Sequence, residues 1–110
     1  MLDKPAPIKE LFQAVQEYML SLDGITEVPK KQYIAYRATQ NIVCVEIQQK
    51  KILLFIKLDP KKYPGPPELS RDASQIGHFG TGDLEITVKS GSDFEQAKRF
   101  LDLAYGKLDG

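Results

Sequence analysis

The hydrophobic pattern of residues 5–24 predicts an amphipathic helix. Apolar residues recur at steps of three and four, and most positions between them are charged or carry amides. Pro5 and Pro7 suit a first helical turn, where backbone N–H groups lack partners, and Gly24 suits the position after a helix end. We therefore expect one helix that turns an apolar face to the core: Ile8, Leu11, Phe12, Val15, Met19 and Leu22.

Three runs rich in β-branched and aromatic residues predict strands at residues 33–37, 42–48 and 51–58. The links between these runs are short. They indicate antiparallel hairpins, because a parallel crossover needs a dozen or more residues. The third run is apolar on both faces, which predicts a central strand that is covered at least partly on each side.

The next part of the chain predicts a loop, a short helix and a fourth strand. Residues 61–67 are rich in proline and show no periodicity, and residues 68–75 are expected to form one or two helical turns. Alternation then predicts a strand at residues 84–88. Its core-facing residues would be Leu84, Ile86 and Val88, and its water-facing residues Glu85, Thr87 and Lys89.

A final helix completes the expected architecture. Ser92 and Glu95 have the spacing of a capping box, and apolar residues at helical intervals continue to Leu108. The order helix, three-stranded antiparallel meander, loop with short helix, strand and helix predicts the α+β class, as a small two-layer domain. A length of 110 residues fits a single domain that spans residues 1–110.

Composition restricts the classes of function. Fifteen basic and fifteen acidic residues give a net charge of zero, so only a local patch could attract nucleic acid or an anionic membrane. The single Cys44 excludes an internal disulfide and a multi-thiolate metal site. Neither a secretory signal pattern nor an apolar run of about 20 residues occurs, so we expect a cytoplasmic protein without membrane association.

The densest group of unusual residues lies at positions 76–83, Ile-Gly-His-Phe-Gly-Thr-Gly-Asp. Gly77, Gly80 and Gly82 permit positive φ angles, either for an anion-binding nest of N–H groups or for a tight turn into the next strand. Their spacing matches neither the dinucleotide fingerprint nor the phosphate loop. His78 is the only side chain expected to titrate near neutral pH, as a general base, a ligand-orienting donor or a structural hydrogen-bonding group.

Catalysis would need partners that this region hardly supplies. One histidine excludes a histidine-rich metal site and leaves only Asp72, His78 and Asp83 as a candidate set. A triad with Ser70 or Ser74 lacks a nucleophile-elbow sequence. We therefore expect no catalytic residue, metal or cofactor, and favour binding over enzymatic activity.

Basic and aromatic residues on the predicted sheet form a second candidate surface. Tyr33 and Arg37 share one face of the first strand, Tyr36 lies on the other, and lysines cluster at both ends of the third strand. Such residues can stack and neutralise a nucleic-acid strand, although lysines also protect sheet edges. Arg71 beside Asp72 is either a bracing ion pair or an arginine aimed at an anion.

Four segments of the chain, residues 33–37, 43–45, 58–60 and 71–83, carry a resemblance to a known family. They resemble a bacterial and archaeal domain of unknown function whose members often carry the label "predicted transport protein". In longer members a similar domain follows a predicted nuclease-like domain. Phe79 stands where the family has an aromatic residue, often tryptophan. The resemblance implies a role linked to nucleic acid or a nuclease-like partner, and the lack of a membrane segment argues against transport.

Three hypotheses follow. The first is a non-catalytic binding or accessory module linked to nucleotides or nucleic acid. The second is a small hydrolase that uses His78 with Asp72 or Asp83, and the third is a protein-interaction or dimerisation domain, with a homodimer as one form. The candidate ligand-binding residues are Arg71, Asp72, Gly77, His78, Gly80, Thr81, Gly82, Asp83, Tyr33, Tyr36 and Arg37.

Overall fold

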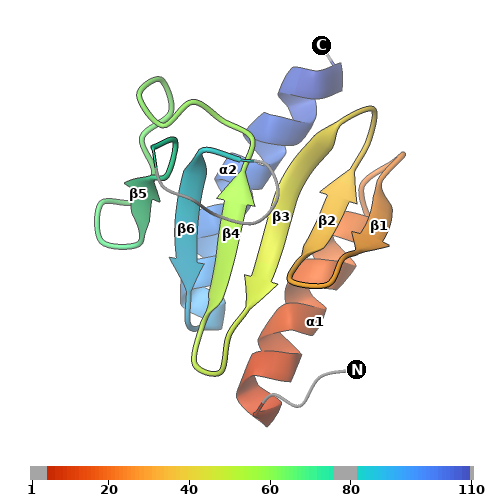
Figure 1. Cartoon of the computed structure of the whole chain (residues 1–110), viewed down its shortest axis with the longest axis vertical. Helices are drawn as coiled ribbons and strands as arrows, with labels where there is room; N and C mark the ends of the chain where they lie inside the picture. The colour runs from red at the N-terminus through yellow and green to blue at the C-terminus, as the bar shows by residue number, and fades with distance from the viewer. Residues whose placement is uncertain (1–4, 76–81, 110) are drawn as a thin grey trace.

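A computed structural model of the chain describes residues 5–75 and 82–109. Within these residues one antiparallel sheet has the strand order β1-β2-β3-β4-β6-β5, and both helices lie on the same face of it (Figure 1). The α+β prediction is confirmed. The elements are α1 (Ala6–Leu20), β1 (Thr26–Pro29), β2 (Ile34–Arg37), β3 (Asn41–Ile47), β4 (Ile52–Ile56), β5 (Ser70–Asp72), β6 (Leu84–Val88) and α2 (Gly91–Asp109).

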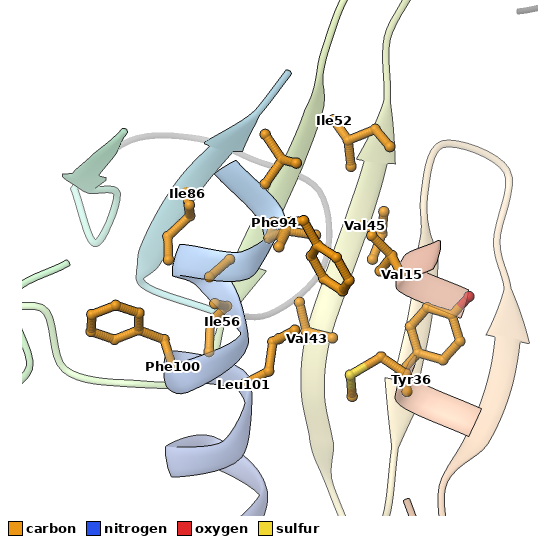
Figure 2. Packing of buried hydrophobic residues seen from close by; sticks show 14 of the residues in the cluster. Val15, Tyr36, Val43, Val45, Ile52, Ile56, Ile86, Phe94, Phe100 and Leu101 are labelled. Carbon is orange, nitrogen blue, oxygen red and sulfur yellow. The ribbon is translucent and has the colours of Figure 1, made fainter. Parts of the chain in front are cut away.

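The main core fills the space between the sheet and the two helices. Figure 2 shows Val15 of α1 and Phe94 and Leu101 of α2 directed toward the strands. Helix α1 buries the face that its periodicity predicts. The helices also touch each other, because the rings of Tyr18 and Phe94 meet edge to face with centroids 5.9 Å apart. The connection after α1 contains Gly24 at a φ of 78°, as expected for a glycine beyond a helix end.

Strand β4 is central, which confirms the prediction from its apolar pattern. It pairs with β3 on one side and β6 on the other, and all five of its residues are buried. Ile52, Leu54 and Ile56 join the main core. Leu53 and Phe55 belong to a second, smaller cluster, which we call the rear cluster; its other buried members are Ala35, Cys44 and Ala73.

Two local predictions were wrong, and one edge strand was not predicted. Residues 70–72 form β5 instead of a helix, because they pair with β6 and supply hydrogen bonds to its otherwise open edge. Residues 26–29, to which no element was assigned, form edge strand β1. The cap of α2 uses Ser90 and Asp93, two residues before the expected pair: Asp93 donates its N–H to Ser90 Oγ at 3.2 Å and accepts the N–H of Lys89 at 2.9 Å.

Candidate functional site

The best-defined charged pair of the sheet joins β5 to β6. Arg71 and Glu85 stand directly opposite each other in the ladder. Arg71 Nε donates to Glu85 Oε2 and Arg71 Nη2 to Glu85 Oε1, both at 3.0 Å. The pair is asymmetric, since the side chain of Arg71 is 57% exposed and that of Glu85 only 7%. Bidentate geometry fixes the plane of the guanidinium as well as its position.

This pair ends a row of residues that crosses the sheet on the side away from the helices. Successive strand pairings place Ala35 beside Cys44, Cys44 beside Phe55, Phe55 beside Glu85 and Glu85 beside Arg71. The first three belong to the rear cluster. A carboxylate therefore lies next to a buried phenylalanine, where loss of water is costly unless hydrogen bonds compensate, and Arg71 provides them.

The prediction that Glu85 faces water was wrong, since the residue is 5% exposed. Alternation along β6 places Glu85 opposite the main core, as expected, but that side of the sheet is also covered at this point. A signal was available in the sequence. The apolar residues on both faces of β4 indicate two covered faces, and a strand paired beside β4 shares that cover.

Asp72 forms a local turn at the end of β5. Its Oδ1 accepts the N–H of Ser74 at 2.9 Å and the hydroxyl of Ser74 at 2.6 Å. These hydrogen bonds, together with the positive charge of Lys61, lower the pKa of the Asp72 carboxyl. Asp72 does not pair with Arg71, so the alternative in which these neighbours form a mutual ion pair does not hold.

Gly82 lies where the chain enters β6 and touches the backbone of β4. Its φ is 134°, and a Cβ atom placed there would stand 2.4 Å from the carbonyl oxygen of Phe55. Glycine is required at this position by both conformation and space. The adjacent Asp83 has an exposed side chain, and its carbonyl oxygen accepts the N–H of Ala73 at 2.7 Å.

The remaining candidates on β2 point in different directions. Tyr33, just before β2, is half-buried against the rear cluster, and Arg37 is exposed at the other end of the strand. Tyr36 is fully buried in the main core and donates its hydroxyl to Glu27 at 2.7 Å. Burial and this hydrogen bond raise the pKa of Tyr36 above its ordinary value. Tyr36 therefore holds β1 to β2 and lies apart from Arg37.

The other predicted ligand-binding residues, Gly77, His78, Gly80 and Thr81, lie outside the residues that the structure describes. The structure thus gathers Arg71, Asp72, Gly82 and Asp83 around the adjoining ends of β5 and β6. Glu85, which the sequence prediction did not include, connects them to the sheet.

The chemistry available at this edge is that of a positioned cation. Both carboxylate oxygens of Glu85 accept hydrogen bonds from Arg71, so this carboxylate is already engaged within the sheet. Cys44 is fully buried and so cannot meet a substrate. In residues 5–75 and 82–109, no group of three histidine, cysteine, aspartate or glutamate side chains is placed to hold a metal ion.

Comparison with known proteins places the chain in a family. Residues 1–106 match the family described as "Domain of unknown function (DUF5655)". The chain belongs to this family. An uncharacterized protein of Haemophilus influenzae is 36% identical to it over 91 residues, which are 82% of this chain and 30% of that protein. The chain therefore spans under a third of this relative, and no solved structure matches it.

These comparisons support the expectation of an uncharacterised bacterial domain and assign no activity to DUF5655. The described part of the chain also contains no helix of the length and apolar character needed to cross a membrane.

Proposed function

We propose that this DUF5655 domain is a non-catalytic binding module that takes an oxyanion, such as a nucleotide phosphate, beside β5 with Arg71 as the principal contact. One observation carries the proposal: an exposed arginine is held in a fixed plane by a buried carboxylate. The side chain of Arg71 is 57% exposed, so an anion in solvent can reach its guanidinium.

The hydrogen-bonding capacity of Arg71 supports this role. A guanidinium carries five N–H donors, and Glu85 engages only Nε and one side of Nη2. The remaining donors have a direction set in advance, which lowers the entropic cost of binding an anion. Arginine matches the geometry of phosphate and carboxylate oxygens better than lysine does, because its fork can bind two oxygens at once.

The proposed site also includes the glycine-rich residues that precede β6. Gly77, Gly80 and Thr81 would supply backbone N–H groups to the anion, as inferred from the sequence, and His78 would orient the ligand. Asp72 hydrogen-bonds to Ser74 through Oδ1, while Arg71 pairs with Glu85.

NMR titration tests the proposal directly. Amide shifts of the native chain would be followed at millimolar concentrations of inorganic phosphate, pyrophosphate, ATP and citrate, which separates phosphate from carboxylate ligands. We expect saturable shifts at β5 and β6 for at least one anion. Arg71→Lys keeps the charge but loses the planar fork, and should weaken binding roughly tenfold or more, as the loss of ~1.5–3 kcal/mol for a hydrogen bond to a charged group implies.

A matched control is Arg99→Lys, since Arg99 is an exposed arginine on α2 that lies over the ring of Phe100. That variant should bind like the native chain. Absence of saturable shifts at β5 with all four anions, or equal weakening by both substitutions, would rule the proposal out.

The chain covers only 30% of the Haemophilus relative. This coverage is consistent with an accessory domain within larger proteins. We propose that in such proteins the domain supplies anion recognition to a partner region of the nuclease-like kind, and that residues 1–110 act as one cytoplasmic domain.

A further inference from the structure

The connections at one end of the sheet bring together lysines that are far apart in the sequence. The pairing of Pro29 with Ile34 closes the turn at residues 30–33, and that of Ile47 with Ile52 closes the turn at residues 48–51. The pairing of Ile52 with Val88 sets the exit of β6 beside the second turn. Figure 1 shows all three connections at the same end. We call this surface the lysine end: Lys30, Lys31, Lys50, Lys51 and Lys89.

The lysine end carries a concentrated positive charge in a chain whose net charge is zero. Four of its lysines are exposed and Lys51 is half-buried. The ion pairs of the described residues are Arg71–Glu85 and Lys98–Glu95, so none of the five lysines is neutralised by one. Residues 30–33, 48–51 and 89–92 contain no acidic residue.

The carboxylates closest to these three connections in the sequence are Glu46 and Asp93, and each accepts a hydrogen bond. Glu46 accepts a hydrogen bond from the amide of Gln48 at 2.6 Å. Asp93 accepts the backbone N–H of Lys89 and caps α2. This cap also occupies the start of α2, so the helix terminus adds little to the attraction of an anion. The five lysines therefore supply the field at this end.

We propose that the lysine end binds the phosphate backbone of nucleic acid without sequence preference. This surface is separate from the Arg71 site and goes beyond the function proposed above. Lysine, glutamine and serine side chains, which dominate these three connections, are typical donors to phosphate oxygens. Lysine is depleted in protein–protein interfaces, so the same composition disfavours a protein partner.

The shape of the lysine end also favours nucleic acid over a membrane. Among the described residues the exposed large hydrophobic side chain is Leu20, the last residue of α1, so the described part of the lysine end presents no exposed large hydrophobic side chain to lipid. From the β1–β2 turn to β6 the lysines cover between three and four strand spacings, roughly 17 Å at ~4.8 Å per strand. That length matches about five phosphates of one strand at ~3.4 Å each.

Salt dependence provides a quantitative test. Binding of a fluorescent duplex and its single strand would be followed by anisotropy at several salt concentrations. If all five lysines contact phosphates, the slope of log K against log salt should approach about −4.5 for duplex and about −3.5 for single strand. Affinity should then fall roughly 100- to 500-fold between about 50 and about 200 mM salt. Unrelated sequences should bind equally.

Charge-removing variants locate the contact. Lys50→Gln/Lys51→Gln should reduce the magnitude of the slope by about 2, and replacing all five lysines by glutamine should abolish binding at low salt. The matched control is Lys61→Gln/Lys62→Gln, whose two exposed lysines follow β4 at the other end of the sheet. This control should retain the native slope, and Arg71→Lys is measured in parallel to separate the lysine end from the Arg71 site. Circular dichroism would verify that each variant is folded.

Several results would overturn the proposal. One is no binding of either nucleic acid by the native chain at low salt. Another is an equal loss in the Lys61/Lys62 control. Equal affinity for phosphatidylserine vesicles or polyglutamate would assign the surface to a membrane or an acidic protein. If Arg71→Lys alone lost nucleic-acid binding, the Arg71 site and not the lysine end would be the binding surface.

Discussion

Replacement of Gly82 by alanine should destabilise the fold far more than the same change at Gly24. At Gly82 the added Cβ would lie 2.4 Å from the carbonyl oxygen of Phe55, 2.5 Å from its carbonyl carbon and 2.9 Å from the nitrogen of Ile56. All three are backbone atoms of β4, which is held by strands on both sides. They cannot move aside as the end of a flexible side chain could.

The expected cost has two parts. A non-glycine residue at the φ of 134° found for Gly82 stores about 1–3 kcal/mol of conformational strain. Forcing a methyl group against a packed backbone adds about 1–3 kcal/mol. The sum of about 2–6 kcal/mol is a large share of the roughly 5–15 kcal/mol that stabilises an ordinary domain.

Gly24 separates these two contributions. Its φ is 78°, and a Cβ atom there would meet nothing within 4 Å, so only conformational strain remains. Gly24→Ala should cost about 1–2 kcal/mol.

Urea unfolding followed by circular dichroism measures both variants against the native chain. With an unchanged slope m, the midpoint should fall slightly for Gly24→Ala and much further for Gly82→Ala. Equal shifts in the two variants would refute the packing argument. A large difference would assign Gly82 primarily to the fold, as the residue whose backbone packs against β4 at the entry to β6.

Two further predictions concern the polar pairs of the sheet. Arg71→Ala leaves the carboxylate of Glu85, which is only 7% exposed, without its two hydrogen-bond donors. We expect urea unfolding to show a loss of about 1.5–3 kcal/mol in the free energy of unfolding. The double variant Arg71→Ala/Glu85→Leu should be more stable than Arg71→Ala, because it removes the unpaired buried carboxylate. A double variant less stable than Arg71→Ala would contradict this. Because the folded pKa of Tyr36 is raised above 10.0, its hydroxyl contributes stability below pH 10 that is lost as the pH rises further. Melting temperatures should therefore fall less steeply above pH 10 in Tyr36→Phe, and an unchanged pH profile would refute this role.

The elements with strong periodicity could be predicted from the sequence. The apolar stripe of α1 and the two-sided apolar run of β4 each specify how a segment must be covered, because burial of apolar surface dominates the free energy of folding. The α+β class follows from the order of such segments. Short polar segments carry less information. Residues 70–72 have no pattern that favours a strand, and they form β5 only because β6 offers an edge to pair with.

The candidate site was only partly predictable for the same reason. Arg71, Asp72, Gly82 and Asp83 were selected by residue type and proximity in the sequence, and the fold brings them to one edge of the sheet. Glu85 was assigned to water, because alternation identifies the two faces of a strand but not whether the second face is covered. Tyr36 illustrates the converse, since its residue type suggested a ligand contact and its position buries it.

By itself, the sequence determined where the two long helices and the central strands lie, and that the chain has one cysteine and no excess charge. Only the tertiary structure decided that Arg71 forms an ion pair with Glu85, that Gly82 contacts the backbone of β4, and that five lysines from three connections lie at one end of the sheet. The periodicity of a segment shows which of its side chains must be buried. The three features above depend instead on strand order and register, which bring together residues that are distant in the sequence.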